Sequence, residues 1–340
     1  MSDLLPVSRS SSSPQKIGVL LLNLGTPDGT DYWSVRRYLG EFLSDPRVIE
    51  TPKALWWPIL NLFVLSTRPQ KSGEAYSLIW DRERDDSPLR VITRAQADNL
   101  AQRLAGDGIM VDFAMRYGNP STRSVLEKME AAGCRRILLM PLYPQYSATT
   151  TATANDKAFD ALRRMRWQPA VRTGPAYFDD PKYVEVLGES IREGIAALDF
   201  EPELVLTSYH GLPQSYVDKG DPYERHCHET TRLVGEYLGW PASRLKVTFQ
   251  SRFGPSKWLS PATDTTLETL PKQGVKKVAI LAPAFHADCI ETLEEIAIGG
   301  KESFLAAGGE NFAYIPCLND TQASMDMIEA MVRRELSGWL

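Results

Sequence analysis

Short runs of consecutive apolar residues recur along the chain and alternate with amphipathic stretches. The runs are apolar at nearly every position rather than at every second one, which is typical of strands that helices cover on both faces. The pattern therefore predicts parallel strands at seven places: Ile17–Asn23, Met110–Met115, Arg136–Met140, Leu204–Tyr209, Leu245–Gln250, Val278–Ala282 and Phe312–Ile315.

Apolar residues at helical spacing fill the intervals between these strands. Tyr183, Leu187 and Ile191 recur every four residues behind Pro181, a residue suited to the first turn of a helix. A closing helix is predicted around Ile328. Strands that alternate with helices in this way favour an α/β fold with doubly wound parallel sheets.

Three pairs of similar segments recur in the same order in the two halves of the chain, which indicates a duplicated domain. We predict a disordered tail at residues 1–15, an N-terminal α/β half at 16–172 and a C-terminal α/β half at 173–340, each a parallel sheet flanked by helices. The pairs are NLGTP at 23–27 with YHGLP at 209–213, MRYGNPS at 115–121 with SRFGPSK at 251–257, and GCRRILLMPLYPQYS from 133 with GVKKVAILAPAFHADC from 274.

Composition narrows the class of protein further. The net charge is -5, so the basic excess of a nucleic-acid-binding protein is missing and no nucleic-acid partner is expected. The chain has no run of about 18 apolar residues and no secretory signal, which predicts a cytoplasmic location. Cys134, Cys227, Cys289 and Cys317 form no C-x-x-C pair and are predicted to be free thiols in a reducing compartment.

The apolar segment Ala54–Leu65 has two interpretations. It is either a buried helix or an exposed lip that meets a hydrophobic substrate or a bilayer surface. Pro58 and the pair Trp56 and Trp57 favour the lip, because tryptophan prefers partly wet places. A peripheral membrane contact through Ala54–Leu65 is therefore part of the prediction.

Polar side chains follow two strands of the C-terminal half. His210 comes directly after the strand Leu204–Tyr209, and Asp288 and Glu291 follow Val278–Ala282 through a short turn. Ligands of open parallel sheets bind beyond the carboxyl ends of the strands, so these groups are expected to face one cleft. The N-terminal half has Leu24 and Thr149 where the C-terminal half has His210 and Glu291, which predicts one site per chain.

Asp288, Glu291 and Glu295 are spaced i, i+3, i+7 and would share one face of an α-helix. Carboxylates crowded on one face attract a cation, and a histidine with carboxylates suits a divalent first-row metal. The structural alternative is a capping box formed by Asp288 and Glu291, with His210 as an ordinary structural histidine.

The cluster His226, Cys227 and His228 is interpreted as a solvated helix face. Helical positions two apart point about 200° apart, so the two histidines cannot chelate one ion together.

Seven segments resemble the ferrochelatase family and follow one another in the family's order from about residue 17 to residue 320. They are LLNLGTPD (21–28), FAMRYGNP (113–120), LYPQYSATTT (142–151), SYHGLP (208–213), GDPY (220–223), FQSRFGPSKWLSP (249–261) and DCIETLEEI (288–296).

The resemblance implies two similar halves with a porphyrin cleft between them, and an enzyme that inserts ferrous iron into protoporphyrin IX to form haem. It implies His210 and Glu291 as the catalytic and metal-handling residues, with Asp288 and Glu295 on a proton path. The residues that it implies for the porphyrin pocket are Arg116, Tyr117, Phe285 and Trp258.

Two departures from relatives in the family affect these expectations. The chain has no cysteine after Cys317, so no [2Fe–2S] cluster is expected, and iron is expected as a substrate rather than a resident cofactor. Cys289 stands where some relatives have a histidine. Two alternatives stay open: a chelatase for cobalt or another tetrapyrrole, and a non-catalytic haem or metal carrier, against which the acidic residues count.

Overall fold

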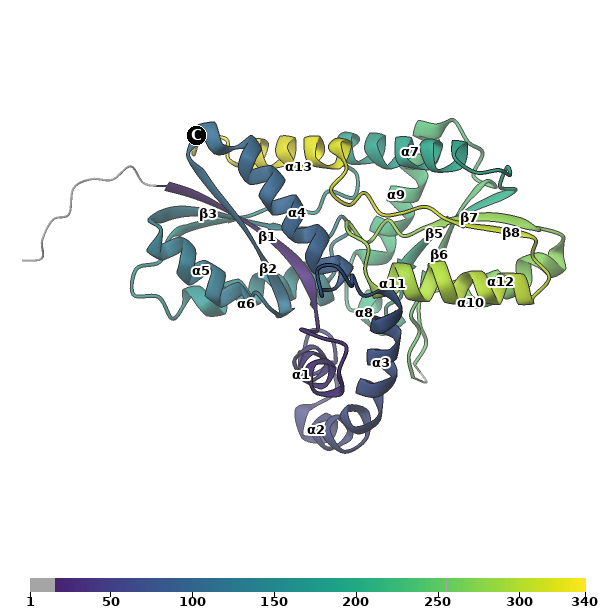
Figure 1. Cartoon of the computed structure of the whole chain (residues 1–340), viewed down its shortest axis with the longest axis horizontal. Coiled ribbons are helices and arrows are strands. Elements are labelled where there is room, and N and C mark those ends of the chain that lie inside the picture. The colour runs from purple at the N-terminus through teal and green to yellow at the C-terminus, as the bar shows by residue number, and fades with distance from the viewer. Residues whose placement is uncertain (1–15, 255) are drawn as a thin grey trace, which may run out of the picture.

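Two four-stranded parallel sheets form the framework of the computed structural model, which describes residues 16–254 and 256–340 (Figure 1). The tail predicted for residues 1–15 lies outside the described residues. The first sheet has the order β2-β1-β3-β4, with β1 (Lys16–Thr26), β2 (Ile109–Gly118), β3 (Cys134–Pro141) and β4 (Ala170–Thr173). The second has the order β6-β5-β7-β8, with β5 (Leu204–His210), β6 (Leu245–Gln250), β7 (Lys277–Leu281) and β8 (Asn311–Tyr314).

The two sheets have the same strand order, and this confirms the predicted α/β fold of two similar halves. All seven predicted strands are present within a few residues of their expected bounds, and β4 was missed. No residue of β4 is fully buried, so its four residues lack the apolar run that marks the other strands. The predicted boundary between residues 172 and 173 falls inside β4, and the division into domains stays a prediction.

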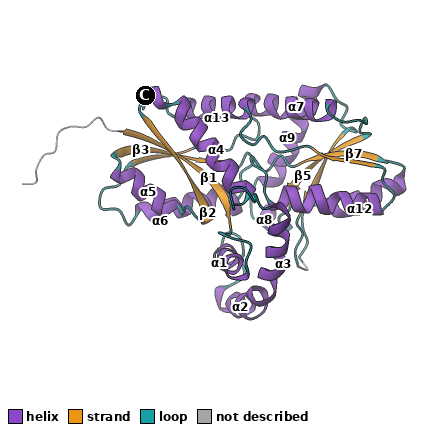
Figure 2. Ribbon diagram, viewed as in Figure 1, coloured by secondary structure: helices purple, strands orange, loops and turns teal. Residues whose placement is uncertain are grey.

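Helices lie on both faces of each sheet (Figure 2). The predicted helices behind Pro181 and around Ile328 are confirmed as α7 and α13. The α-helices of the first half are α1 (Tyr32–Leu43), α2 (Lys53–Ile59), α3 (Leu65–Ile79), α4 (Pro88–Arg103), α5 (Thr122–Ala131) and α6 (Thr153–Leu162). The others are α7 (Pro181–Ala196), α8 (Gln214–Asp218), α9 (Tyr223–Leu238), α10 (Thr263–Thr269), α11 (Ile290–Thr292), α12 (Lys301–Ala306) and α13 (Gln322–Glu335). Three π-helical segments, η1 (Leu60–Val64), η3 (Ala148–Ala152) and η5 (Leu293–Gly300), and two 3₁₀ turns, η2 (Ala105–Asp107) and η4 (Leu270–Gln273), complete the list.

One hydrophobic core is shared by the two halves. Leu21 of β1, Val205 of β5 and Ile328 of α13 belong to the same buried cluster. Burying apolar surface between the sheets stabilises their relative placement, at roughly 25 cal/mol for each Å² removed from water. The halves therefore pack as one body around a continuous core.

The apolar segment Ala54–Leu65 lies in a helical projection built from α1, α2, η1 and α3, at the bottom of Figure 1. Its side chains are mostly exposed: Leu62 and Phe63 each have a relative exposure of 67%. Only Leu60 and Leu65 are buried. The interpretation as a buried helix is therefore wrong. In the described part of the chain, no helix combines the length and apolar character needed to cross a bilayer.

Gly25 offers a test of the close packing between β1 and β2. Its φ is +116°, and a Cβ at this position would lie 1.8 Å from the carbonyl oxygen of Tyr117. Both strain and a backbone clash oppose any side chain there. We expect Gly25→Ala to lower the free energy of unfolding, measured in urea, by more than the roughly 1–2 kcal/mol that a left-handed conformation alone costs.

Gly108→Ala is the matched control, because Gly108 has a φ of +67° but no atom within 4 Å of the added Cβ. Equal losses of stability in the two variants would contradict the clash at Gly25.

Candidate functional site

The carboxyl ends of β5, β6 and β7 place the predicted residues at one edge of the second sheet. His210 is the last residue of β5 and pairs in register with Gln250, the last residue of β6. The chain leaving β7 leads to Glu291 in α11. Parallel pairing therefore brings His210 and the Glu291 segment to the same edge.

His210 lies in a partly buried, largely apolar environment. The Phe285 ring meets the His210 ring edge-on, with centroids 6.4 Å apart and planes at 76°. Burial lowers the pKa of His210 below its ordinary value, and the nearby Glu291 carboxylate opposes this to a smaller extent. The imidazole is therefore neutral at neutral pH and able to accept a proton or bind a metal ion.

Trp258 lies beside Gly211, the residue that follows His210. A Cβ added at Gly211, which follows His210, would lie 3.3 Å from the indole carbon Cε3 of Trp258. The indole N–H donates to the Phe253 carbonyl oxygen over 2.8 Å, which fixes the ring. The structure thus brings His210, Phe285 and Trp258 together.

The segment that carries Glu291 is not a regular α-helix. α11 has only three residues, and the chain continues as the π-helix η5 from Leu293. Asp288 precedes the helix, so the expected single α-helical face of Asp288, Glu291 and Glu295 is wrong. The alternative of a capping box formed by Asp288 and Glu291 is also wrong. The residue that caps the helix is Cys289, and its N–H donates to Thr292 Oγ1 over 3.0 Å.

Asp288 is buried, and hydrogen bonds from three side chains hold its carboxylate. The donors are Thr292 Oγ1 at 2.9 Å, the Tyr314 hydroxyl at 2.6 Å and Asn319 Nδ2 at 2.7 Å. Each oxygen of the Asp288 carboxylate therefore accepts at least one hydrogen bond. The role of Asp288 in a proton path stays a prediction.

Glu295 lies next to the end of β6. Burial raises the pKa of Glu295 above its ordinary value, although hydrogen bonds from Ser251 and Gln250 oppose the shift. The Ser251 N–H donates over 2.7 Å. Gln250 Nε2 donates to Glu295 Oε2 over 3.3 Å and to the Glu291 carbonyl oxygen over 2.7 Å. Sequence reasoning did not single out Gln250, although its position at a strand's carboxyl end was a usable signal.

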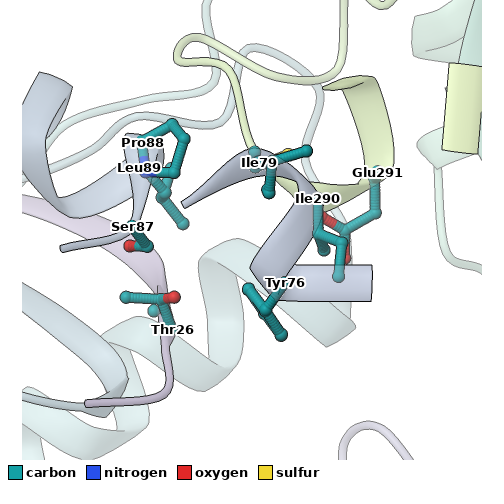
Figure 3. A pocket seen from close by; sticks show the side chains of 10 residues that line it. Thr26, Tyr76, Ile79, Ser87, Pro88, Leu89, Ile290 and Glu291 are labelled. Atoms are coloured by element: carbon teal, nitrogen blue, oxygen red, sulfur yellow. The ribbon is translucent and has the colours of Figure 1, made fainter. Parts of the chain in front are cut away.

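A cavity of about 10 Å³ lies between the halves, beside Glu291 (Figure 3). Thr26, Tyr76 and Ser87 line it from the N-terminal half, and Ile290 and Glu291 line it from the C-terminal half. This volume is about the smallest that holds one water molecule. Burial, and to a smaller extent the Glu291 carboxylate, raises the pKa of Tyr76. The Glu291 carboxylate thus lies close to side chains of both halves.

Arg116 and Tyr117 lie in a buried polar network around Asp45. The Arg116 guanidinium and Thr153 Oγ1 donate to the Asp45 carboxylate, and the Tyr117 hydroxyl donates over 2.8 Å. Burial raises the pKa of Asp45, but the hydrogen bond from Thr153, with those from other donors and the charge of Arg116, outweighs it and leaves the pKa below its ordinary value. A direct contact of Arg116 and Tyr117 with the porphyrin stays a prediction.

The four cysteine thiols are free, as predicted. Cys289 is buried beside Leu89 and Ala287. Burial raises the pKa of the Cys289 thiol. At this position the chain presents a protonated thiol at neutral pH.

The interpretation of His226, Cys227 and His228 as a solvated face is wrong for the first two residues. His226 and Cys227 are buried in α9, and only His228 is exposed. His226 Nδ1 accepts the Tyr146 N–H over 3.2 Å, and its ring stacks on Phe178 at 3.6 Å. Tertiary packing overrides the polar sequence, because an imidazole can pack as an aromatic ring while its nitrogen is satisfied. Among the described residues, no group of three or more potential ligands forms a metal cage.

His226→Ala is expected to lower the free energy of unfolding by about 2–4 kcal/mol, because it removes a buried ring and leaves the Tyr146 N–H unpaired. The exposed neighbour His228→Ala should change it by less than about 0.5 kcal/mol. Urea unfolding of both variants checks the difference, and equal stabilities would contradict the buried placement of His226.

The sequence is similar to proteins named ferrochelatase over nearly its whole length. A family model described as Ferrochelatase matches residues 16–336. A protein named ferrochelatase from Mesorhizobium japonicum is 61% identical over 327 residues, which cover 96% of this chain and 92% of that protein. A protein with the same name from Rhizobium meliloti is 59% identical over 326 residues, which cover 96% of both chains.

Solved structures with the same arrangement of halves are far more distant in sequence. SirB from Bacillus subtilis, solved with Fe³⁺, superposes with a TM-score of 0.56 at 12% identity and covers 95% of this chain and 97% of its own. CbiX, described as the terminal enzyme for siroheme biosynthesis in denitrifying bacteria, superposes with a TM-score of 0.51 at 13% identity. The superposition covers 96% of this chain and 99% of CbiX. At these identities the likeness shows the fold alone.

Proposed function

The chain belongs to the ferrochelatase family, and from this premise we propose that His210 and Glu291 carry out its reaction. The protein is an enzyme that inserts ferrous iron into protoporphyrin IX to give haem, with iron and porphyrin as its substrates. The observation that carries the residue assignment is the meeting of a neutral imidazole and a carboxylate at one sheet edge beside an apolar wall.

Metal insertion displaces two pyrrole protons, so the reaction needs bases near the macrocycle. His210 is held neutral by burial and can accept a pyrrole proton or bind ferrous iron through a ring nitrogen. Glu291 supplies a carboxylate that binds the incoming cation or takes up a proton. Two such groups hold iron weakly enough to release it to the porphyrin, whereas a closed cage of four ligands would retain it.

Protons leave Glu291 along the acidic segment toward Glu295. Burial favours the protonated form of Glu295, which suits a residue that receives a proton. Gln250 contacts both the Glu291 main chain and the Glu295 side chain and keeps the two glutamates in a fixed relation. Asp288 anchors the start of the same segment and would complete the path.

The macrocycle lies against Phe285, whose ring meets His210 edge-on, and against Trp258, which lies beside Gly211. A flat apolar substrate suits aromatic walls of this kind. In this proposal the N-terminal half contributes Arg116 and Tyr117, which are buried around Asp45, to the porphyrin site. Strain applied to the ring would tilt a pyrrole lone pair toward the metal and would derive from binding energy.

The assignment predicts that His210→Ala and Glu291→Gln each lower kcat at least about 100-fold, because each removes a group that handles a proton or the metal. The assay mixes enzyme with protoporphyrin and ferrous iron without oxygen and follows the Soret band over many equivalents. His228→Ala is the matched histidine control and should retain turnover. Near-normal turnover by the Glu291 variant would refute its role.

The same assay separates an enzyme from a carrier. Turnover beyond one equivalent is the enzymatic result. Uptake that stops at one equivalent would contradict catalysis and support a non-catalytic haem carrier.

The exposed apolar residues of α2 and η1 act as a peripheral membrane contact for a cytoplasmic enzyme. Leu55, Ile59, Leu62 and Phe63 follow the i, i+4, i+7, i+8 spacing of one helical face, and all four are exposed. An apolar face turned to solvent marks an interaction site, and an interfacial helix uses such a face to enter the headgroup region. This position suits exchange of an apolar porphyrin with a bilayer.

Replacing Leu62 and Phe63 together by glutamate should reduce co-sedimentation with phospholipid vesicles at least about tenfold, because two apolar anchors become charged. Leu305→Glu on α12 is the control, since Leu305 is an exposed leucine outside this face. Unchanged sedimentation of the double variant would contradict the membrane contact.

A further inference from the structure

The chain between β7 and α11 is neither strand nor helix, yet it determines where Glu291 lies. This segment runs from Ala282 to Cys289. An irregular segment keeps its shape only through the contacts that other elements make with it. The elements that make those contacts include α4, α7, α13, the chain that follows β4 and the chain between β8 and α13.

His286 is the first of two fixed points in this segment and is 2% exposed. Its Nδ1 lies 3.1 Å from the Tyr177 hydroxyl, and its Nε2 lies 2.9 Å from Ser324 Oγ. Ser324 Oγ donates its single proton to the Asn319 carbonyl oxygen over 2.8 Å. Nε2 must therefore carry the imidazole proton, and Tyr177 must donate to Nδ1.

This arrangement excludes His286 from acid–base or metal chemistry, although it is the histidine nearest to Glu291 in the sequence. Both ring nitrogens are engaged by protein groups. Burial lowers the pKa of His286 to about 4, so the ring stays neutral through the physiological range. The residue holds the loop in place.

Asn319 is the second fixed point. Its side chain pairs twice with Asp288: Oδ1 accepts the Asp288 N–H over 2.8 Å, and Nδ2 donates to Asp288 Oδ2 over 2.7 Å. Its N–H donates to the His286 carbonyl oxygen over 2.9 Å. Its own carbonyl oxygen accepts from Gln96 Nε2 of α4 over 2.8 Å. Asn319 has a φ of +51°, a conformation that asparagine tolerates better than most residues.

The connection continues to the catalytic segment. Asp288 accepts from Thr292 Oγ1 over 2.9 Å, and Thr292 follows Glu291 directly in α11. The two fixed points thus tie the start of α11 to elements of both halves.

We propose that His286 and Asn319 are positioning residues that hold Glu291 toward His210 at the edge of the second sheet. The proposal rests on the proposed role of Glu291. A catalytic group displaced by about 1 Å loses up to about 100-fold in rate, so the effect of losing either fixed point should fall on kcat. Substrate binding depends on the aromatic walls and should change little.

The test uses the full chain with Asn319→Gly and His286→Phe. Glycine keeps the left-handed backbone and removes only the paired side chain, and phenylalanine keeps the ring and removes its nitrogens. Each variant should lower kcat about 10- to 100-fold while KM for porphyrin and for iron stays within about threefold. Loss of stability with wild-type kcat would overturn the proposal.

His226→Phe is the matched control, because it removes the nitrogens of another buried histidine that has no bond to the Glu291 segment. It should lose stability and keep kcat. A loss of kcat as large as in His286→Phe would overturn the proposal, since the effect would then be general.

Two further measurements distinguish the proposal from the proposed function. In a Glu291→Gln background, Asn319→Gly should cause no further loss of kcat. If Glu291→Gln alone has normal kcat, the proposed function fails; if only Asn319→Gly is normal, the positioning role fails. Nitrogen-15 spectra should show His286 as the Nε2–H tautomer without titration above about pH 5, and titration near the usual histidine pKa would overturn the assigned contacts.

Discussion

The parallel pairing of β5 with β6 and β7 is the constraint on which the site depends. It places His210 opposite Gln250 and brings the chain that leaves β7 to the same edge. Because successive side chains of a strand point to opposite faces, a slip of one residue would turn His210 to the other face of the sheet. The apolar interior of the sheet therefore fixes the register, and the register fixes where the chemistry occurs.

Burial has opposite effects on the bases and acids of the site and favours neutral forms of both. It lowers the pKa of His210 and raises that of Glu295. Burial thus favours the neutral imidazole of His210 and makes Glu295 a better proton acceptor than an exposed glutamate. Asp45 behaves differently, because hydrogen bonds and the Arg116 guanidinium keep it charged despite burial. Burial raises the pKa of both carboxyl groups, but that of Asp45 stays below its ordinary value because the donors around it include Thr153 and the Arg116 guanidinium.

Polar bonds join the two halves of the chain in addition to the shared core. Gln96 Nε2 donates to the Asn319 carbonyl oxygen over 2.8 Å, and the Tyr146 N–H donates to the His226 ring over 3.2 Å. Together with the shared core, these bonds oppose a free opening of the halves. The helical projection that carries Phe63 is the part of the first half that extends away from this joint toward solvent (Figure 1).

The sequence by itself determined seven of the eight strands and the two similar halves, because a run of apolar residues is a property of neighbouring positions. It also placed His210 and Glu291 at or after the ends of two strands, while their chemical roles stay a prediction. Tertiary structure alone decided that Glu291 lies in a three-residue helix followed by a π-helix, that Asp288 is held by Asn319 and that His226 is buried. These features depend on hydrogen bonds and packing between residues that are dozens or more positions apart. A polar residue looks the same in a sequence whether its partner is water or a distant side chain, and only the fold provides that partner.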